Sequence, residues 1–204
     1  MHMKKSIIGL AVVASSFFVH ADEIRTDKVD FSLAAERSDL PTLTVGAGGA
    51  PMKLYFDFVD HKFKTIEPMA LNIALHNPDA AFTGLQLKLA SVTANGHALT
   101  AGNKKSVYDF YMGSKAGSDG TFMVPHGNSA SEPFTGVSPL TSAELGMANL
   151  GAFDGVSGGH SNDIIATTYV SLESTSGDDT LTDDTYSDNA SLHVQTNWVG
   201  YSAN

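Results

Sequence analysis

The segment Val29-Asp30-Phe31-Ser32-Leu33-Ala34-Ala35-Glu36 has the pattern of a single β-strand standing apart from the rest of the chain. Apolar side chains at positions 29, 31, 33 and 35 alternate with polar ones at 30, 32 and 36. This period of two is typical of a strand with one apolar face. We therefore expect the exported chain to begin with a strand that needs a partner.

The residues before this strand have the three parts of a secretion signal. Lys4 and Lys5 precede an apolar run over 7–19, and small residues around Ala21 form a cleavage site before Asp22. The apolar run is shorter than the roughly 20 residues that a membrane-spanning helix needs. The sequence predicts a signal peptide over 1–21, an N-terminal extension over 22–36 and one domain over 37–204.

Cleavage would take 21 of the 204 residues and leave 183, which suits one domain with a sizeable core. It would also remove two of the twelve Lys and Arg residues and none of the 22 acidic ones, leaving a net charge of −12. Such a charge argues against nucleic acid and anionic lipid as partners. The chain has no cysteine, so packing and strand pairing alone must stabilise the exported fold.

Period-two alternation recurs along the rest of the chain and predicts seven or eight short strands. Turn-forming residues separate them, such as Asn77-Pro78-Asp79 and Asn95-Gly96. This arrangement is typical of an all-β sandwich. The alternating runs are Leu43 and Val45; Leu54, Phe56 and Phe58; Met69, Leu71, Ile73 and Leu75; Leu85, Leu87 and Leu89; residues 107–112; Ile165, Thr167 and Tyr169; and Leu192, Val194, Thr196 and Trp198. Seven aromatic residues lie in strand patterns and are expected in the core: Tyr55, Phe56, Phe58, Phe63, Tyr108, Phe110 and Tyr111.

Residues 113–163 are rich in Gly, Ser and Asn, and we expect long loops and irregular edge strands there. Thr141 and Glu144 form a capping box, which predicts a short helix near 142–149. The acidic segment 177–189 is expected to be a solvated loop before the last strand.

The chain offers no convincing catalytic or metal-binding set. Ser157 lies in a Gly-X-Ser-X-Gly pattern, but the flanking residues do not form the strand and helix that a nucleophile elbow requires. The aspartates from Asp178 onward lack the spacing of a calcium loop. The histidines show no pair at metal-ligand spacing, and Lys104-Lys105 is the only adjacent basic pair after the signal. We expect no enzyme, no metal, no cofactor and no nucleic-acid partner.

An unpartnered strand, an exported cysteine-free sandwich and the lack of a catalytic set together indicate assembly. A sandwich that lacks one strand exposes unpaired backbone and apolar pockets, which an extended segment of another molecule can fill. The spacing predicts that Val29, Phe31, Leu33 and Ala35 are the side chains that plug such pockets.

The sequence also resembles the family of major pilins of the E. coli common pilus (Mat fimbria), in the alternative or α class of chaperone–usher pilins. The stretch 29–36 is similar to that family's donor strand, residues 52–75 and 82–91 are similar to its early strands, and residues 191–198 are similar to its terminal strand. The resemblance covers 22–112 and 164–204 at low identity.

The resemblance implies an incomplete immunoglobulin-like sandwich that polymerises by donor-strand exchange. It implies export through the periplasm to the cell surface, where the fimbrium supports cell adhesion and biofilm formation. The implied partners are identical pilin subunits, a periplasmic chaperone that lends a strand and an outer-membrane usher, with a tip adhesin as a further candidate.

Two other classes remain open. A secreted carbohydrate- or host-binding adhesin domain would need an exposed aromatic cluster or a calcium loop. A secreted hydrolase built on Ser157 ranks last.

Overall fold

A computed structural model describes most of the chain after the predicted signal. The described residues are 24–28, 42–47, 51–76, 84–114, 120–156, 163–175, 177, 180–181 and 184–199. Their elements are β1 (Ile24–Lys28), β2 (Thr42–Ala47), β3 (Leu54–Asp57), β4 (Lys62–Thr65), β5 (Met69–His76), β6 (Gly84–Thr93), β7 (Ala98–Ala101), β8 (Lys104–Gly113), β9 (Thr121–Met123), α1 (Ser142–Met147), a 3-10 helix η1 (Gly151–Phe153), β10 (Ile164–Ser174) and β11 (Ala190–Val199).

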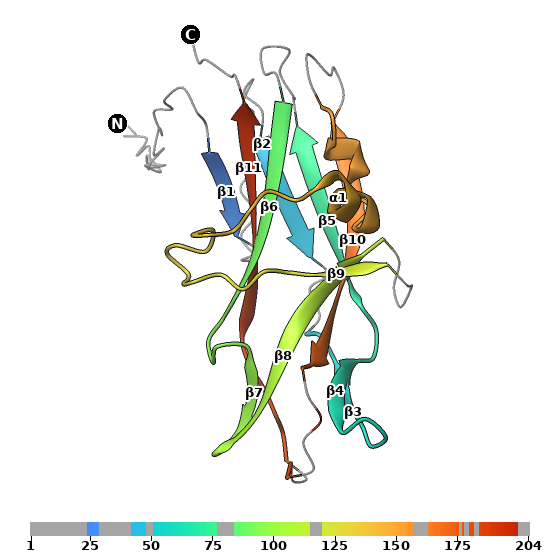
Figure 1. Ribbon diagram of the computed structural model, residues 1–204, viewed down its shortest axis with the longest axis vertical. Coiled ribbons are helices and arrows are strands. Elements are labelled where there is room, and N and C mark those ends of the chain that lie inside the picture. Colours follow the sequence, from blue (N-terminus) through green and yellow to red (C-terminus); the bar gives the residue numbers. More distant parts are fainter. Residues whose placement is uncertain are drawn as a thin grey trace, which may run out of the picture.

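The strands form two antiparallel sheets, as the alternation predicted (Figure 1). The small sheet has the order β1-β11-β6. In the large sheet, β10 pairs with β8 along one side and with β5 and then β4 along the other. Strands β2 and β3 add to β5 and β4, while β9 and β7 add to the two ends of β8. The expectation of an all-β sandwich is confirmed.

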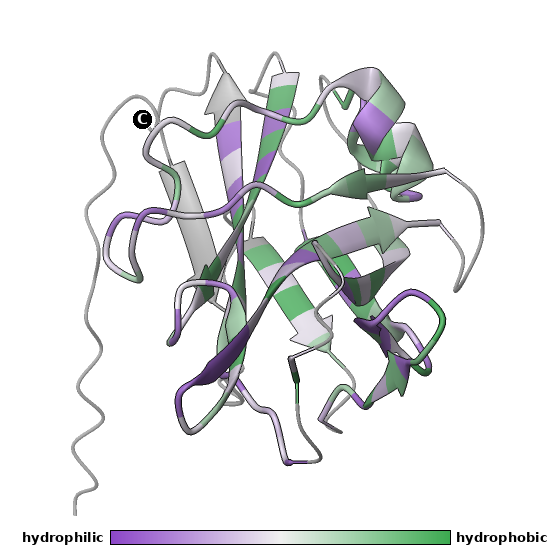
Figure 2. Cartoon of the chain, turned by 60° about the horizontal axis from the view of Figure 1, so that its bottom comes forward, coloured by the Kyte–Doolittle hydropathy of each residue, from purple (hydrophilic) through white to green (hydrophobic). Residues whose placement is uncertain are grey.

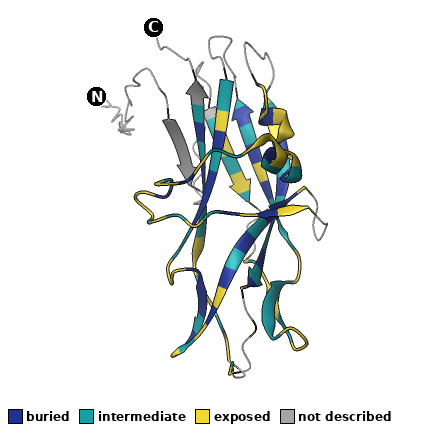
Figure 3. Ribbon diagram, viewed as in Figure 1, coloured by how far each residue is buried: buried dark blue, intermediate teal, exposed yellow. Residues whose placement is uncertain are grey.

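The core lies between the two sheets and takes every second side chain of their strands. Figure 2 shows the alternation as bands of hydropathy, and Figure 3 shows the same period in burial. In the runs at 71–75, 85–89 and 192–196 the predicted residues are buried, except Leu85 and Leu192, which are half-buried. The buried apolar side chains of the strands include Leu71, Ile73, Leu75, Leu87, Leu89, Tyr108, Phe110, Met112, Val170, Leu172 and Val194.

The predicted core is wrong at β10 and after the end of β3, as well as at two tyrosines on the outer face of the large sheet. In β10 the buried positions are the even ones, Ala166 to Leu172, so the run that begins at Ile165 faces outward and Ile165 itself is 63% exposed. Phe58 follows the end of β3 and is 78% exposed, because the chain turns there instead of continuing as a strand.

Residues 120–156 contribute more to the fold than the loops expected for them. Phe122 and Val124 enter the core, and α1 and η1 add Leu145 and Phe153. The helix α1 has the predicted capping box: the Glu144 N–H donates to the Thr141 hydroxyl, and the Glu144 carboxylate accepts from the Thr141 N–H. No helix within the described ranges is long and apolar enough to cross a membrane.

The segment 124–140, which we call the strap, runs across the small sheet and covers the outer edge of β6 (Figure 1). Ser91 of β6 donates its N–H to the Pro125 carbonyl at 2.9 Å and accepts from the Gly127 N–H at 2.7 Å. Further along, the Leu140 N–H donates to the Leu87 carbonyl at 2.7 Å. The strap therefore satisfies backbone groups that an open strand edge would leave unpaired.

Candidate functional site

The strand β1 lies along the outer edge of β11, the last strand of the described chain. It pairs antiparallel to β11, from Ile24 opposite Asn197 to Lys28 opposite His193. On its other side β11 pairs with β6 over its whole length. Strand β1 also contacts β2, the edge strand of the large sheet. It therefore occupies the seam at which the two sheets meet, on the side of β11 away from β6.

The predicted plug residues follow β1 directly in the sequence. Val29, Phe31, Leu33 and Ala35 lie outside the described residues, so their prediction stands as made. The structure does describe the other side of this seam, which is the edge of β11 that pairs with β1. Without β1, the backbone of residues 193–197 would lose its neighbour on that side.

The side chains of β11 that point between the sheets are fully buried at this seam. Val194 and Thr196 each have no exposed surface. The Thr196 hydroxyl is buried without a hydrogen-bond partner among the described residues. Such a group lowers stability, since its bonds to water are lost without replacement.

A second feature is a groove of about 500 Å³ on the outer face of the large sheet. Its lining comes mostly from outward-facing positions of β3, β4, β8 and β10, which lie side by side in the sheet. The lining residues are Tyr55, Lys62, Lys64, Thr65, Ile66, Pro68, Asp109, Tyr111, Gly113, Thr121, Tyr169, Ser171, Leu172, Glu173, Ser174 and Thr175.

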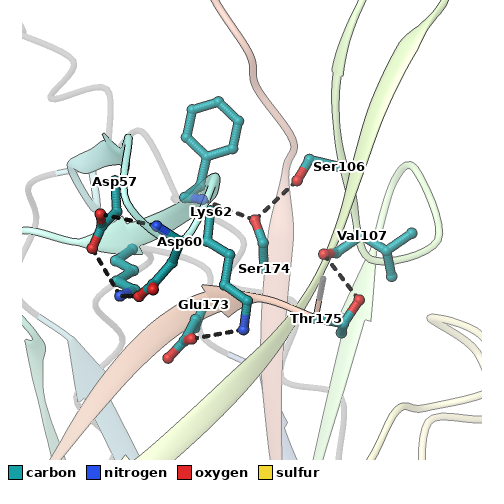
Figure 4. A network of polar contacts seen from close by, with 10 residues as sticks. Asp57, Asp60, Lys62, Ser106, Val107, Glu173, Ser174 and Thr175 are labelled. Carbon is teal, nitrogen blue, oxygen red and sulfur yellow. Dashed lines mark hydrogen bonds and ion pairs between the residues drawn. The ribbon is translucent and has the colours of Figure 1, made fainter. Parts of the chain in front are cut away.

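Ion pairs hold the β3–β4 hairpin that forms one wall of this groove (Figure 4). The Lys64 ammonium lies 2.9 Å from the Asp57 carboxylate and also contacts Asp60. The hydrogen bond from Lys64 is the largest cause that lowers the pKa of Asp57, followed by the bond from the Val59 N–H. Lys62 reaches across to Glu173 on β10 at 3.1 Å.

Hydroxyl groups fasten the hairpin to the strand beside it. The Phe63 N–H donates to the Ser174 hydroxyl at 3.0 Å, and that hydroxyl lies 2.9 Å from the hydroxyl of Ser106 on β8 (Figure 4). The Thr65 hydroxyl donates to the Leu172 carbonyl at 3.1 Å and accepts from the Leu172 N–H at 2.7 Å. The wall of the groove is thus fixed to its floor by side chains as well as by strand pairing.

Three tyrosines line the groove from three different strands. Tyr55 on β3 is 45% exposed, and Tyr111 on β8 and Tyr169 on β10 are half-buried. Burial raises the pKa of Tyr111, and the carboxylates of Asp109 and Glu173 raise it further. The expectation that the aromatic residues of the strands lie in the core therefore fails for Tyr55 and Tyr111.

The histidines bind neighbouring side chains. His97 and His126 stack with ring centroids 3.7 Å apart, and His126 lies 2.7 Å from the Asp109 carboxylate. His97 lies 2.9 Å from the Ser91 hydroxyl. Across the described ranges, no three His, Asp or Glu side chains are grouped so that they could hold a metal ion.

The remaining predicted features are only partly described. Ser157 and His160 lie outside the described residues, as do Asp178, Asp179 and Asp183. Asp188 has a structural role. Its carboxylate accepts hydrogen bonds from the buried Tyr108 hydroxyl at 2.9 Å and from the Asn95 N–H at 3.1 Å.

The sequence patterns do not predict the groove. Its signal was present in the outward positions of β8 and β10, where Asp109, Tyr111, Tyr169 and Glu173 place aromatic and acidic groups on one face. These residues lie on one surface because Tyr169 and Glu173 face outward from β10, whereas the alternation expected for β10 places that side in the core.

Comparison of the chain with protein-family models, with curated proteins and with solved structures returned no match.

Proposed function

We propose that this chain is a structural subunit of a chaperone–usher surface pilus and that it polymerises by donor-strand exchange. The observation that carries the proposal is the position of β1. A lone N-terminal strand, paired with β11 and with no other described strand, lies in the slot beside the last strand. Strand addition from another molecule needs a slot of this kind.

The neighbouring sequence supports the same reading. The segment 29–35 has the alternation of a donor strand, and it is joined directly to β1. In a fibre, the extension of one subunit would leave its own β11 and fill the seam of the next subunit. Before assembly, a periplasmic chaperone would supply the missing strand, and an outer-membrane usher would exchange it.

The proposed product is a fimbrium on the cell surface that supports adhesion and biofilm formation. Export depends on the predicted signal peptide over 1–21. The subunit acts without a catalytic group, because a polymer formed by strand exchange needs only backbone pairing and pocket filling.

The test compares two neighbouring substitutions in the predicted donor strand. Phe31→Asp would place a charge in an apolar pocket and cost several kcal/mol at each junction. Ser32→Asp would point to the opposite face of the strand and should leave assembly intact. We expect Phe31→Asp to accumulate as exported monomer and Ser32→Asp to give fibres, visible as heat-sensitive ladders on gels of unboiled protein.

The reverse result would show that the register is wrong by one residue. Normal fibres from both variants would exclude residues 29–35 as the donor strand.

A further inference from the structure

The groove on the large sheet lies apart from the edge proposed for assembly. It is formed on β3, β4, β8 and β10, whereas the seam belongs to β1, β11 and β2. A ligand in the groove would therefore leave the strand-exchange edge free. The two sites can be tested independently.

The aromatic lining offers flat apolar surfaces at fixed positions. Tyr55 lies opposite Lys64 in the β3–β4 pairing, and Tyr111 lies opposite Ser171 in the β8–β10 pairing. Tyr169 lies opposite Gly113, which has no side chain to cover it. A tyrosine ring combines a large rigid apolar surface with a polar hydroxyl and loses little conformational entropy on binding.

The polar lining contains both donors and acceptors. Asp109 and Glu173 supply carboxylate oxygens, Lys62 supplies N–H donors, and Thr121, Ser171 and Thr175 supply hydroxyls, which can do both. A sugar has the matching surface, since its C–H faces are apolar and each of its hydroxyls both donates and accepts.

The charges of the groove are balanced within the protein. Lys62 is paired with Glu173 at 3.1 Å, and Lys64 is paired with Asp57 and Asp60. Asp109 accepts from His126 when that ring nitrogen carries a proton, at 2.7 Å. Both lysines of the described lining are therefore paired with carboxylates. These described residues offer no free positive charge to an anionic ligand.

We propose that this groove binds a neutral oligosaccharide, stacked on Tyr55, Tyr111 and Tyr169 and hydrogen-bonded by Glu173 and Ser171. Its volume of about 500 Å³ is within the usual range of ligand sites, roughly 300–1,000 Å³. The hydrogen bonds of the hairpin and its ion pairs organise the wall before the ligand arrives, which reduces the cost of binding.

A proline-rich peptide is the other ligand that aromatic grooves commonly take. Its backbone has carbonyl acceptors but few N–H donors, because proline has none. Such a peptide would leave the carboxylates of Asp109 and Glu173 facing carbonyl oxygens. The carboxylates therefore favour the sugar.

The first step of the test applies the full exported chain to an array of neutral di- to tetrasaccharides and their sialylated counterparts, with a decaproline peptide as a further probe. The sugar that binds best is then titrated by calorimetry against the wild type and its variants. We expect a neutral sugar to bind, and Tyr55→Ala and Tyr111→Ala each to weaken it about tenfold.

Phe58→Ala is the matched control. Phe58 belongs to the same hairpin and is 78% exposed, yet it does not line the groove. Phe58→Ala should bind the sugar like the wild type. Because Tyr55 and Phe58 are both exposed, neither change to alanine leaves a cavity in the core. Unchanged affinity in Tyr55→Ala, equal losses in Tyr55→Ala and Phe58→Ala, a preference for sialylated sugars or for decaproline, or the lack of any binding would each overturn the proposal.

Discussion

Two buried threonines of the core differ in one hydrogen bond. Thr196 on β11 and Thr168 on β10 both have no exposed surface. The Thr168 hydroxyl donates to the Gly113 carbonyl at 3.0 Å, whereas the Thr196 hydroxyl has no partner among the described residues. Valine has the same shape as threonine, so the pair isolates the effect of the hydroxyl.

We expect Thr196→Val to raise the free energy of unfolding by about 1 kcal/mol, because it removes a buried polar group that forms no bond. Thr168→Val should lower it by about 1 kcal/mol, because the hydrogen bond from the Thr168 hydroxyl to the Gly113 carbonyl is lost. Urea denaturation of the monomer measures both changes. A loss of stability in Thr196→Val would mean that its hydroxyl has a partner in the folded protein.

The stacked histidines predict a dependence of stability on pH. Burial lowers the pKa of His97 from its ordinary value of 6.5, and the neighbouring His126 lowers it further. The folded protein then binds fewer protons than the unfolded chain as the pH falls below about 6.5, so stability is lost from there down to the lowered pKa.

The variant that tests this is His97→Asn, since His97 has a φ of 58° and asparagine tolerates this left-handed conformation. Between pH 7.5 and pH 5, the melting temperature of the wild type should fall more than that of His97→Asn. Parallel curves for the two proteins would assign the acid sensitivity to other groups.

At the scale of elements, the strap depends on a close approach at Gly127. A Cβ atom added there would lie 2.8 Å from the Pro133 carbonyl oxygen and 2.8 Å from a methyl group of Val92. The strap therefore packs on the outer face of β6 with no room for a side chain at this position.

Gly127→Ala should destabilise the protein by about 1–3 kcal/mol, because the strap must move away from β6. Gly146 in α1 is the control, since nothing lies within 4 Å of an added Cβ there. Gly146→Ala should stabilise by about 0.5–1 kcal/mol, as a helix gains from the loss of glycine. Thermal denaturation of the two variants measures the contrast, and equal effects would contradict the packing described for the strap.

The elements that the sequence predicted well are those with one apolar and one polar face. The run from Met69 to Leu75 and the capped helix at Thr141 are of this kind. In β10 the alternation predicts the wrong phase, because the outward side carries Ile165 and Tyr169 while the buried side carries Thr168. The groove depends on that phase and on the pairing of β4 and β8 with β10. These strands are neighbours in the sheet but far apart in the sequence, so no local sequence pattern predicts their pairing.

At the scale of the whole molecule, the two margins of the small sheet are closed in different ways. The strap closes the β6 margin from the middle of the chain, and β1 closes the β11 margin from near its beginning. If the extension must leave its own seam for strand exchange, holding β1 in place should stop assembly.

The chain has no cysteine, so a single engineered disulfide can hold β1. Thr26 and Gln195 lie directly opposite each other, and such antiparallel pairs have Cα atoms about 4.5–5.5 Å apart, within the range for a disulfide. We expect oxidised Thr26→Cys/Gln195→Cys protein to stay monomeric and to form fibres again after reduction. The single variant Thr26→Cys controls for the substitution, and fibres of oxidised protein with the internal disulfide intact would exclude exchange at this seam.

The direction of β1 and β11 also has a mechanical consequence. Both strands run along the longest axis of the molecule (Figure 1), and the hydrogen bonds of an antiparallel pair lie perpendicular to the strands. Tension along that axis therefore loads all the bonds of the ladder in shear at the same moment, instead of peeling them apart one by one. A thread of subunits joined by such ladders would resist flow with the strength of the whole ladder at each junction.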